Sequence, residues 1–90
     1  MEYTNQQLEE IERLASLYMP ITDIAVIIDV PHDRLREDVA TLPAVANAYR
    51  RGKVRTKLEM RKQEMQLAKL GSAQALESCA EALLEMEEDE

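Results

Sequence analysis

The sequence contains no tryptophan and no phenylalanine, and its only aromatic residues are three tyrosines. A chain without these large rings must build its core from aliphatic side chains, and 46% of its 90 residues are hydrophobic. This composition favours helices over strands, because strands are enriched in aromatic and β-branched residues. Ninety residues provide one small domain, whose single core is marginal unless another contact extends it.

Cysteine, histidine and glycine are also scarce. Cys79 is the only cysteine, which excludes an internal disulfide and a cysteine metal cluster and fits a reducing compartment. His32 is the only histidine, so one chain cannot assemble a histidine metal site or a Cys-His nucleophile. Two glycines are too few for a phosphate-binding loop. We therefore predict that the protein is not an enzyme and holds no metal and no cofactor.

The chain lacks a long hydrophobic run. Its most apolar stretch, residues 21–30, is interrupted by Asp23 and Asp29. It is also far shorter than the ~20 apolar residues that a membrane span requires, and the N-terminus does not read as a signal peptide. We expect a cytoplasmic protein with no membrane partner.

The charge of the chain is strongly segregated. The net charge is −7, yet residues 43–70 carry eight bases and two acids. Residues 1–42 carry nine acids and three bases, and residues 71–90 carry seven acids and no base. A basic helix of this kind indicates either a footprint for a polyanion or the complement of acidic helices in the protein or its oligomer. A solvated face with local ion pairs is disfavoured, because Glu59 and Glu64 cannot neutralise eight bases.

The residues before Pro43 carry the signals of three short helices. Thr4 and Gln7 form a capping box that starts the first helix, and Pro20 ends it. Thr22 is the expected cap of the second helix. The expected core positions are Leu8, Ile11, Leu14, Ala15, Tyr18, Ile24, Ala25, Ile27, Ile28, Val30, Leu35 and Val39. The second and third helices have the spacing of a helix-turn-helix, with a small alanine at the helix contact and an aliphatic residue in the turn.

Pro43 is expected to start a long basic helix that ends before Gly71. At 1.5 Å per residue this helix would be roughly 42 Å long, whereas a domain of ~100 residues has a radius of gyration of ~13 Å. We therefore expect the helix to extend beyond its own domain. Gly52 within it indicates a bend or a close helix contact, since glycine costs ~1 kcal/mol relative to alanine there.

A final acidic helix, capped by Ser72, is expected to return along the long helix. The sequence thus predicts an all-α protein: a helix-turn-helix DNA-binding unit (1–42), an oligomerisation unit formed by the long helix and a helical hairpin (43–84), and an acidic tail (85–90). Mutual repulsion should fray this tail, which would compete with DNA, dock on a partner or only solubilise the protein. The expected oligomer interface consists of Val54, Leu58, Met65, Leu76 and Leu83.

Several short motifs of this sequence occur in an order that resembles a known protein family. Pro43-x-Val45, Ala48-Tyr49-x-x-Gly52-Lys53 and Gly71-Ser72, with Ala75 and Leu76 beyond, resemble the small terminase subunits of tailed bacteriophages and prophages. The resemblance covers nearly the whole chain. It implies a non-enzymatic subunit that binds viral double-stranded DNA near its packaging site and forms a homo-oligomeric ring through its central helices. A large terminase ATPase-nuclease subunit would receive the DNA, in the cytoplasm of a bacterial or phage-infected host cell.

The resemblance would place Arg34 and Arg36 on the recognition helix. Acidic neighbours on that helix, Asp33, Glu37 and Asp38, oppose tight reading of bases by one copy. The other expected DNA contacts are Arg50, Arg51, Lys53, Arg55 and Lys57. Two alternatives stay open: a helix-turn-helix transcriptional regulator, which should be a dimer on a palindromic site, and a helical protein-interaction scaffold without nucleic-acid binding.

Overall fold

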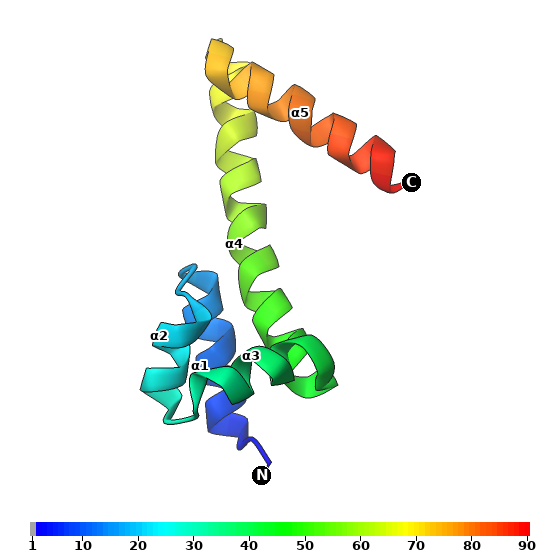
Figure 1. Cartoon of the computed structure of the whole chain (residues 1–90). Coiled ribbons are helices and arrows are strands. Elements are labelled where there is room, and N and C mark those ends of the chain that lie inside the picture. The colour runs from blue at the N-terminus through cyan, green and yellow to red at the C-terminus, as the bar shows by residue number, and fades with distance from the viewer. Residues whose placement is uncertain (1) are drawn as a thin grey trace. The chain divides into compact units, whose positions relative to one another are not determined.

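The computed structural model of the protein describes residues 2–90, which contain helices and turns but no strand. The predicted all-α class is therefore confirmed. The helices are α1 (Asn5–Ser16), α2 (Ile21–Ile28), α3 (His32–Thr41), α4 (Pro43–Lys69) and α5 (Ala73–Asp89) (Figure 1). The chain forms two compact units, the first ending at Thr56 and the second beginning at Lys57.

Helix α1 begins as its capping signals predict. The backbone N–H of Thr4 donates to Gln7 Oε1 at 2.9 Å, and the backbone N–H of Gln7 donates to the Thr4 hydroxyl at 3.0 Å. These bonds satisfy donors that a helix N-terminus leaves unpaired. Ile11, Leu14 and Ala15 then lie on the buried face of α1, as their spacing predicts.

The end of α1 differs from the prediction. The helix ends at Ser16, and Tyr18 takes a left-handed conformation with φ of 58°. The N–H groups of Tyr18 and Met19 donate to the carbonyls of Ala15 and Leu14, at 2.9 and 3.1 Å. This pair of bonds is a Schellman motif, which turns the chain before the proline is reached. The placement of Tyr18 on the apolar face is wrong, because the turn leaves its side chain half exposed.

The predicted cap of α2 is also wrong. The helix starts at Ile21, directly after Pro20, and Thr22 lies inside its first turn. The Pro20 carbonyl accepts the N–H groups of Asp23 and Ile24, both at 3.0 Å. Proline fits this entry position for two reasons. Its fixed φ suits the entry of the chain into the helix, and it has no backbone N–H that would be left without an acceptor there.

The core of the first unit is aliphatic. Helix α2 packs against both α1 and α3 (Figure 1). The buried cluster consists of Ile11, Leu14, Ile24, Ala25, Ile28, Val30, Leu35, Val45 and Ala48. Val45 and Ala48 belong to α4, so the first turns of this helix complete the core and the first unit reaches past Leu42. Any compact three-helix unit needs similar residues, so DNA recognition by α2 and α3 remains a prediction.

Helix α4 starts at Pro43 and ends where the sequence predicts. Gly71 follows it with φ of 96°, a conformation that side chains disfavour. The Ser72 N–H donates to the Leu67 carbonyl at 3.0 Å, which completes a Schellman motif. The Ser72 hydroxyl then accepts the Ala75 N–H at 3.2 Å and caps α5.

Helix α5 continues to Asp89, so the prediction that residues 85–90 fray is wrong. Glutamate is a good helix former, and each residue added to an existing helix gains a backbone bond. Glu85 also pairs with Arg61 of α4 at 3.6 Å. From Lys57 onward only Ala75 is buried, so the second unit is a helical pair with almost no core of its own.

Candidate nucleic-acid interface

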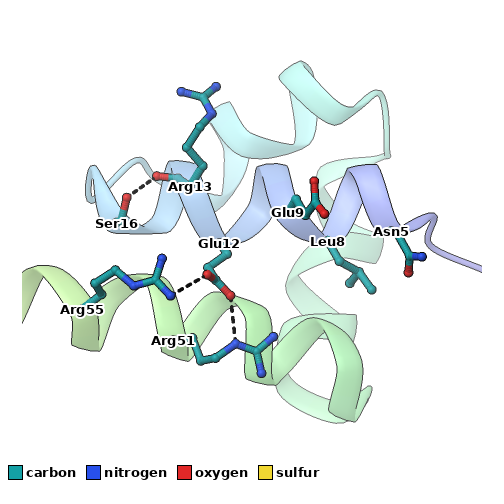
Figure 2. A pocket seen from close by; sticks show the side chains of 8 residues that line it. All are labelled: Asn5, Leu8, Glu9, Glu12, Arg13, Ser16, Arg51 and Arg55. Carbon is teal, nitrogen blue, oxygen red and sulfur yellow. Dashed lines mark hydrogen bonds and ion pairs between the residues drawn. The ribbon is translucent and has the colours of Figure 1, made fainter.

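One carboxylate on α1 binds two arginines of α4. Arg51 Nε lies 2.8 Å from Glu12 Oε1, and Arg55 Nη2 lies 2.9 Å from Glu12 Oε2. Figure 2 shows the Glu12 carboxylate between the two guanidinium groups. The hydrogen bond from Arg51 is the main cause that lowers the pKa of Glu12 below its ordinary value, and Arg55 lowers it further. The carboxylate is therefore ionised at neutral pH.

A glycine brings the two helices close enough for this contact. A Cβ atom on Gly52 would lie 2.2 Å from the Glu12 carbonyl oxygen and 2.8 Å from the Ala15 Cβ. The Thr56 hydroxyl donates to the Ser16 carbonyl one turn further along α4. The expectation of a close helix contact at Gly52 is therefore confirmed, and α4 runs through it without a break.

Some other bases on α4 form no ion pair with an acid of residues 2–90. Arg50, Lys53 and Lys57 follow one another at intervals of three and four residues, which places them on one face of the helix. All three are exposed, and none forms an ion pair within residues 2–90. The Lys53 ammonium lies 5.2 Å from the centre of the Tyr49 ring, a cation–π contact that leaves its positive charge in place. We call these three residues the open basic face.

Helix α3 presents the remaining predicted DNA contacts. Arg34 pairs with Asp38 at 3.5 Å, while Arg36 is exposed. Asp38 also accepts a hydrogen bond from the Tyr3 hydroxyl at 2.6 Å. Burial of the phenol, followed by this bond, raises the pKa of Tyr3 to about 12. Part of the acidic charge on α3 is therefore engaged in attaching the N-terminal segment.

The second unit contains an apolar groove of ≈ 620 Å³ between the end of α4 and α5. Arg61 lies at this groove and pairs with Glu64 at 3.4 Å and with Glu85 at 3.6 Å. Its apolar lining consists of Met65, Ala68, Leu76, Cys79, Ala82, Leu83 and Met86. Three predicted interface residues, Met65, Leu76 and Leu83, thus line one groove, and each is half exposed. Leu58 is exposed in the same unit, and Val54 is exposed in the first.

Cys79 and His32 lie in different units of the chain. Cys79 lines the apolar groove, and the exposed His32 lies 3.1 Å from the carboxylate of the neighbouring Asp33. Residues 2–90 contain no group of three or more His, Cys, Asp or Glu side chains able to hold a metal ion. No helix in this part of the chain is long and apolar enough to cross a membrane.

The sequence did not identify Glu12 as a member of the site. Glu59 and Glu64 lie on the same helix and are the acids that the sequence offers for local pairing, whereas Glu12 precedes Arg51 by 39 positions. A usable signal was present, since Arg51 and Arg55 flank Gly52 and Glu12 directly follows the core residue Ile11. A glycine contact between these helices brings such neighbours together.

No protein-family model matches this sequence, and comparisons with curated proteins and with solved structures found no significant match.

Proposed function

We propose that the protein is a non-enzymatic, oligomeric subunit that binds double-stranded DNA during viral genome packaging. The open basic face carries the DNA-binding part of this proposal. Arg50, Lys53 and Lys57 are exposed and form no ion pair with the acids of residues 2–90, although the net charge of the chain is −7. Positive charge kept in such a row on an acidic protein suits a polyanion, and the DNA backbone supplies one negative charge per ~1.7 Å of duplex.

The oligomeric part rests on the second unit. A helical pair that buries only Ala75 cannot offset the entropy of ordering its chain, because isolated helices of this length are marginal in water. Its long helix bears the basic residues Lys57 and Lys62, whereas α5 contains no base. Side-by-side packing of basic and acidic flanks is a head-to-tail contact, which closes into a ring when the rotation between copies permits.

The packaging context rests on the resemblance to small terminase subunits. Within it, the ring would present DNA to a large ATPase-nuclease subunit in the cytoplasm of a bacterial or phage-infected cell. The acidic end of α5, from Glu85 onward, is the surface that suits a basic region of that partner, since its carboxylates are exposed. Arg34 and Arg36 are secondary DNA contacts, positioned for guanine or phosphate.

Size-exclusion chromatography coupled to light scattering tests the assembly, and fluorescence anisotropy with duplex DNA at several salt concentrations tests the binding. We expect a large closed oligomer and a log affinity that falls linearly with log salt, with a slope of about −0.9 per neutralised phosphate. A monomer across the micromolar range would overturn the ring. A dimer that prefers one palindromic site would favour a transcriptional regulator.

A protein-interaction scaffold is the second candidate, and one observation favours it. Glu12 neutralises part of the charge of Arg51 and Arg55, as expected if the basic helix serves contacts within the protein. A scaffold would bind no duplex DNA at moderate salt. Charge reversal at Arg50 would then change nothing, because neither the unmodified protein nor the variant would bind the duplex.

A further inference from the structure

Arg51 and Arg55 share one carboxylate without using all their donors. Arg51 bonds Glu12 through Nε and Arg55 bonds it through Nη2. A guanidinium group has five N–H donors, so each arginine keeps several for another acceptor. The side chains of Arg51 and Arg55 are 62% and 64% exposed, whereas that of Glu12 is 22% exposed. The acid is thus the covered centre of the cluster, and the unused donors lie at its exposed edges (Figure 2).

We propose that Arg51 and Arg55, while held by Glu12, bind backbone phosphates of nucleic acid, and that Glu12 is the positioning residue of this site. The inference rests on the proposed function and names an acid that assists it. The inner N–H groups stay on the carboxylate, and the outer N–H groups donate to phosphate oxygens. Charge-assisted bonds of this kind are short and directional, so the orientation of each guanidinium affects their strength.

Phosphate binding that keeps Glu12 on the two arginines costs less free energy than phosphate binding that displaces Glu12. A phosphate that replaced Glu12 would break both of its bonds to the arginines and leave a partly covered carboxylate without these partners. Binding at the outer edges breaks no existing bond. The two arginines are also ordered before DNA arrives, so less side-chain entropy is lost on binding. Repulsion between Glu12 and a phosphate opposes binding, but water and salt weaken this repulsion at an exposed site.

The backbone around Glu12 fixes the position of its carboxylate. The close approach of Gly52 to the Glu12 carbonyl, and the bond from Thr56 to Ser16, attach α1 to α4 at the acid itself and one turn after it. Glu12 is therefore presented from a second helix and cannot follow the arginines if they swing away. An acid on α4 itself, one turn from an arginine, lacks this independent support.

The decisive comparison is between Glu12→Gln and Glu9→Gln. Glu9 lines the same cleft, is exposed, and forms no ion pair within residues 2–90. Both substitutions raise the net charge by one, so a charge effect alone should tighten DNA binding equally. We expect Glu9→Gln to bind a labelled duplex as tightly as the unmodified protein or slightly tighter. Glu12→Gln should bind about three- to tenfold more weakly, because two arginines must then be ordered on binding.

A third variant separates positioning from stability. Thr56→Val removes the bond to the Ser16 carbonyl and loosens the same helix contact without altering charge. We expect a lower melting temperature and DNA affinity within about twofold of the unmodified protein, because both arginines keep Glu12. If Thr56→Val weakens DNA binding as much as Glu12→Gln does, Glu12 acts only through stability and the inference is wrong.

The remaining outcomes are also decisive. Tighter binding by Glu12→Gln than by Glu9→Gln would mean that Glu12 competes with phosphate, and equal binding would mean that it contributes charge alone. Either result overturns the inference while leaving DNA binding intact. An unmodified protein that binds no duplex DNA overturns the proposed function, and the inference with it.

Discussion

Replacement of Gly52 by alanine should destabilise the first unit, although alanine is the better helix former. An added Cβ would lie 2.2 Å from the Glu12 carbonyl oxygen and 2.9 Å from the Ser16 backbone nitrogen. Ordinary carbon–oxygen contact requires roughly an ångström more. Both atoms belong to the backbone of α1, so no side-chain rotation can relieve the overlap and the helices must separate.

The change in the free energy of unfolding caused by Gly52→Ala is the sum of opposing effects. Alanine gains about 1 kcal/mol of helix propensity over glycine. Overpacking typically costs 1–3 kcal/mol, and loss of the Thr56 hydrogen bond adds about 1 kcal/mol. The exposed pairs of Glu12 with Arg51 and Arg55 contribute at most ~1 kcal/mol each. We expect a net loss of about 2 kcal/mol, which lowers the melting temperature of a domain this small by roughly 10 °C.

Thermal unfolding followed by circular dichroism measures the effect, with Asn47→Ala as the matched control. Asn47 is exposed on the same helix, so alanine there should be neutral or slightly stabilising. A second variant, Gly52→Ala with Ala15→Gly, removes the 2.8 Å contact between the two Cβ atoms but not the contact with the Glu12 carbonyl. Rescue should therefore be partial. The close helix contact would be refuted if Gly52→Ala melts at or above the temperature of the unmodified protein.

Three further predictions concern binding, assembly and pH. Arg50→Glu should flatten the dependence of log affinity on log salt by about one unit, because one phosphate contact is lost, and an unchanged slope in anisotropy titrations would contradict a role in DNA binding. Leu83→Asp should dissociate the proposed oligomer in light scattering while the first unit stays helical, whereas Glu81→Lys should leave the oligomer intact. A leucine buried in the interface contributes about 2–5 kcal/mol, and an exposed ion pair contributes ~1 kcal/mol or less. The raised pKa of Tyr3 means that its protonated form stabilises the fold fully below pH 10 and that this stabilisation is lost as the pH rises towards about 12. Urea unfolding across that range should reveal the loss, and Tyr3→Phe should abolish this part of the pH dependence.

The helices themselves were predictable because their signals are local. The capping box at Thr4, the entry at Pro43 and the glycine end at Gly71 each act within a few residues, so the sequence reveals them directly. Most aliphatic core positions of α2 and α3 were also predictable, since period and size determine which face is buried. Ile27 was predicted wrongly, because it lies on the half-exposed face of α2.

The wrong or missing predictions concern residues whose conformation or partner depends on distant or competing contacts. The prediction for Tyr18 rests on its helical spacing from Leu14, yet the Schellman bonds end the helix first and turn the chain at this residue. Thr22 was assigned as a cap because its side chain suits that role, although Pro20 already supplies the entry. The end of α5 was predicted to fray from repulsion alone, without the pairing of Glu85 with Arg61. The bonds of Glu12 to the arginines join residues far apart in the chain and depend on tertiary packing.

The near absence of a core in the second unit has a consequence for the local stability of a single chain. Backbone amides in α1 to α3 and in the first turns of α4 are protected by buried side chains, so their hydrogen exchange should be slow. Amides beyond Lys57 depend mainly on helix propensity and on exposed ion pairs, so their opening should cost less free energy than opening of the first unit. One continuous helix, α4, therefore passes from a protected half into a labile half. If the proposed assembly covers this half, limited proteolysis should cleave beyond Lys57 more slowly at protein concentrations where the oligomer forms.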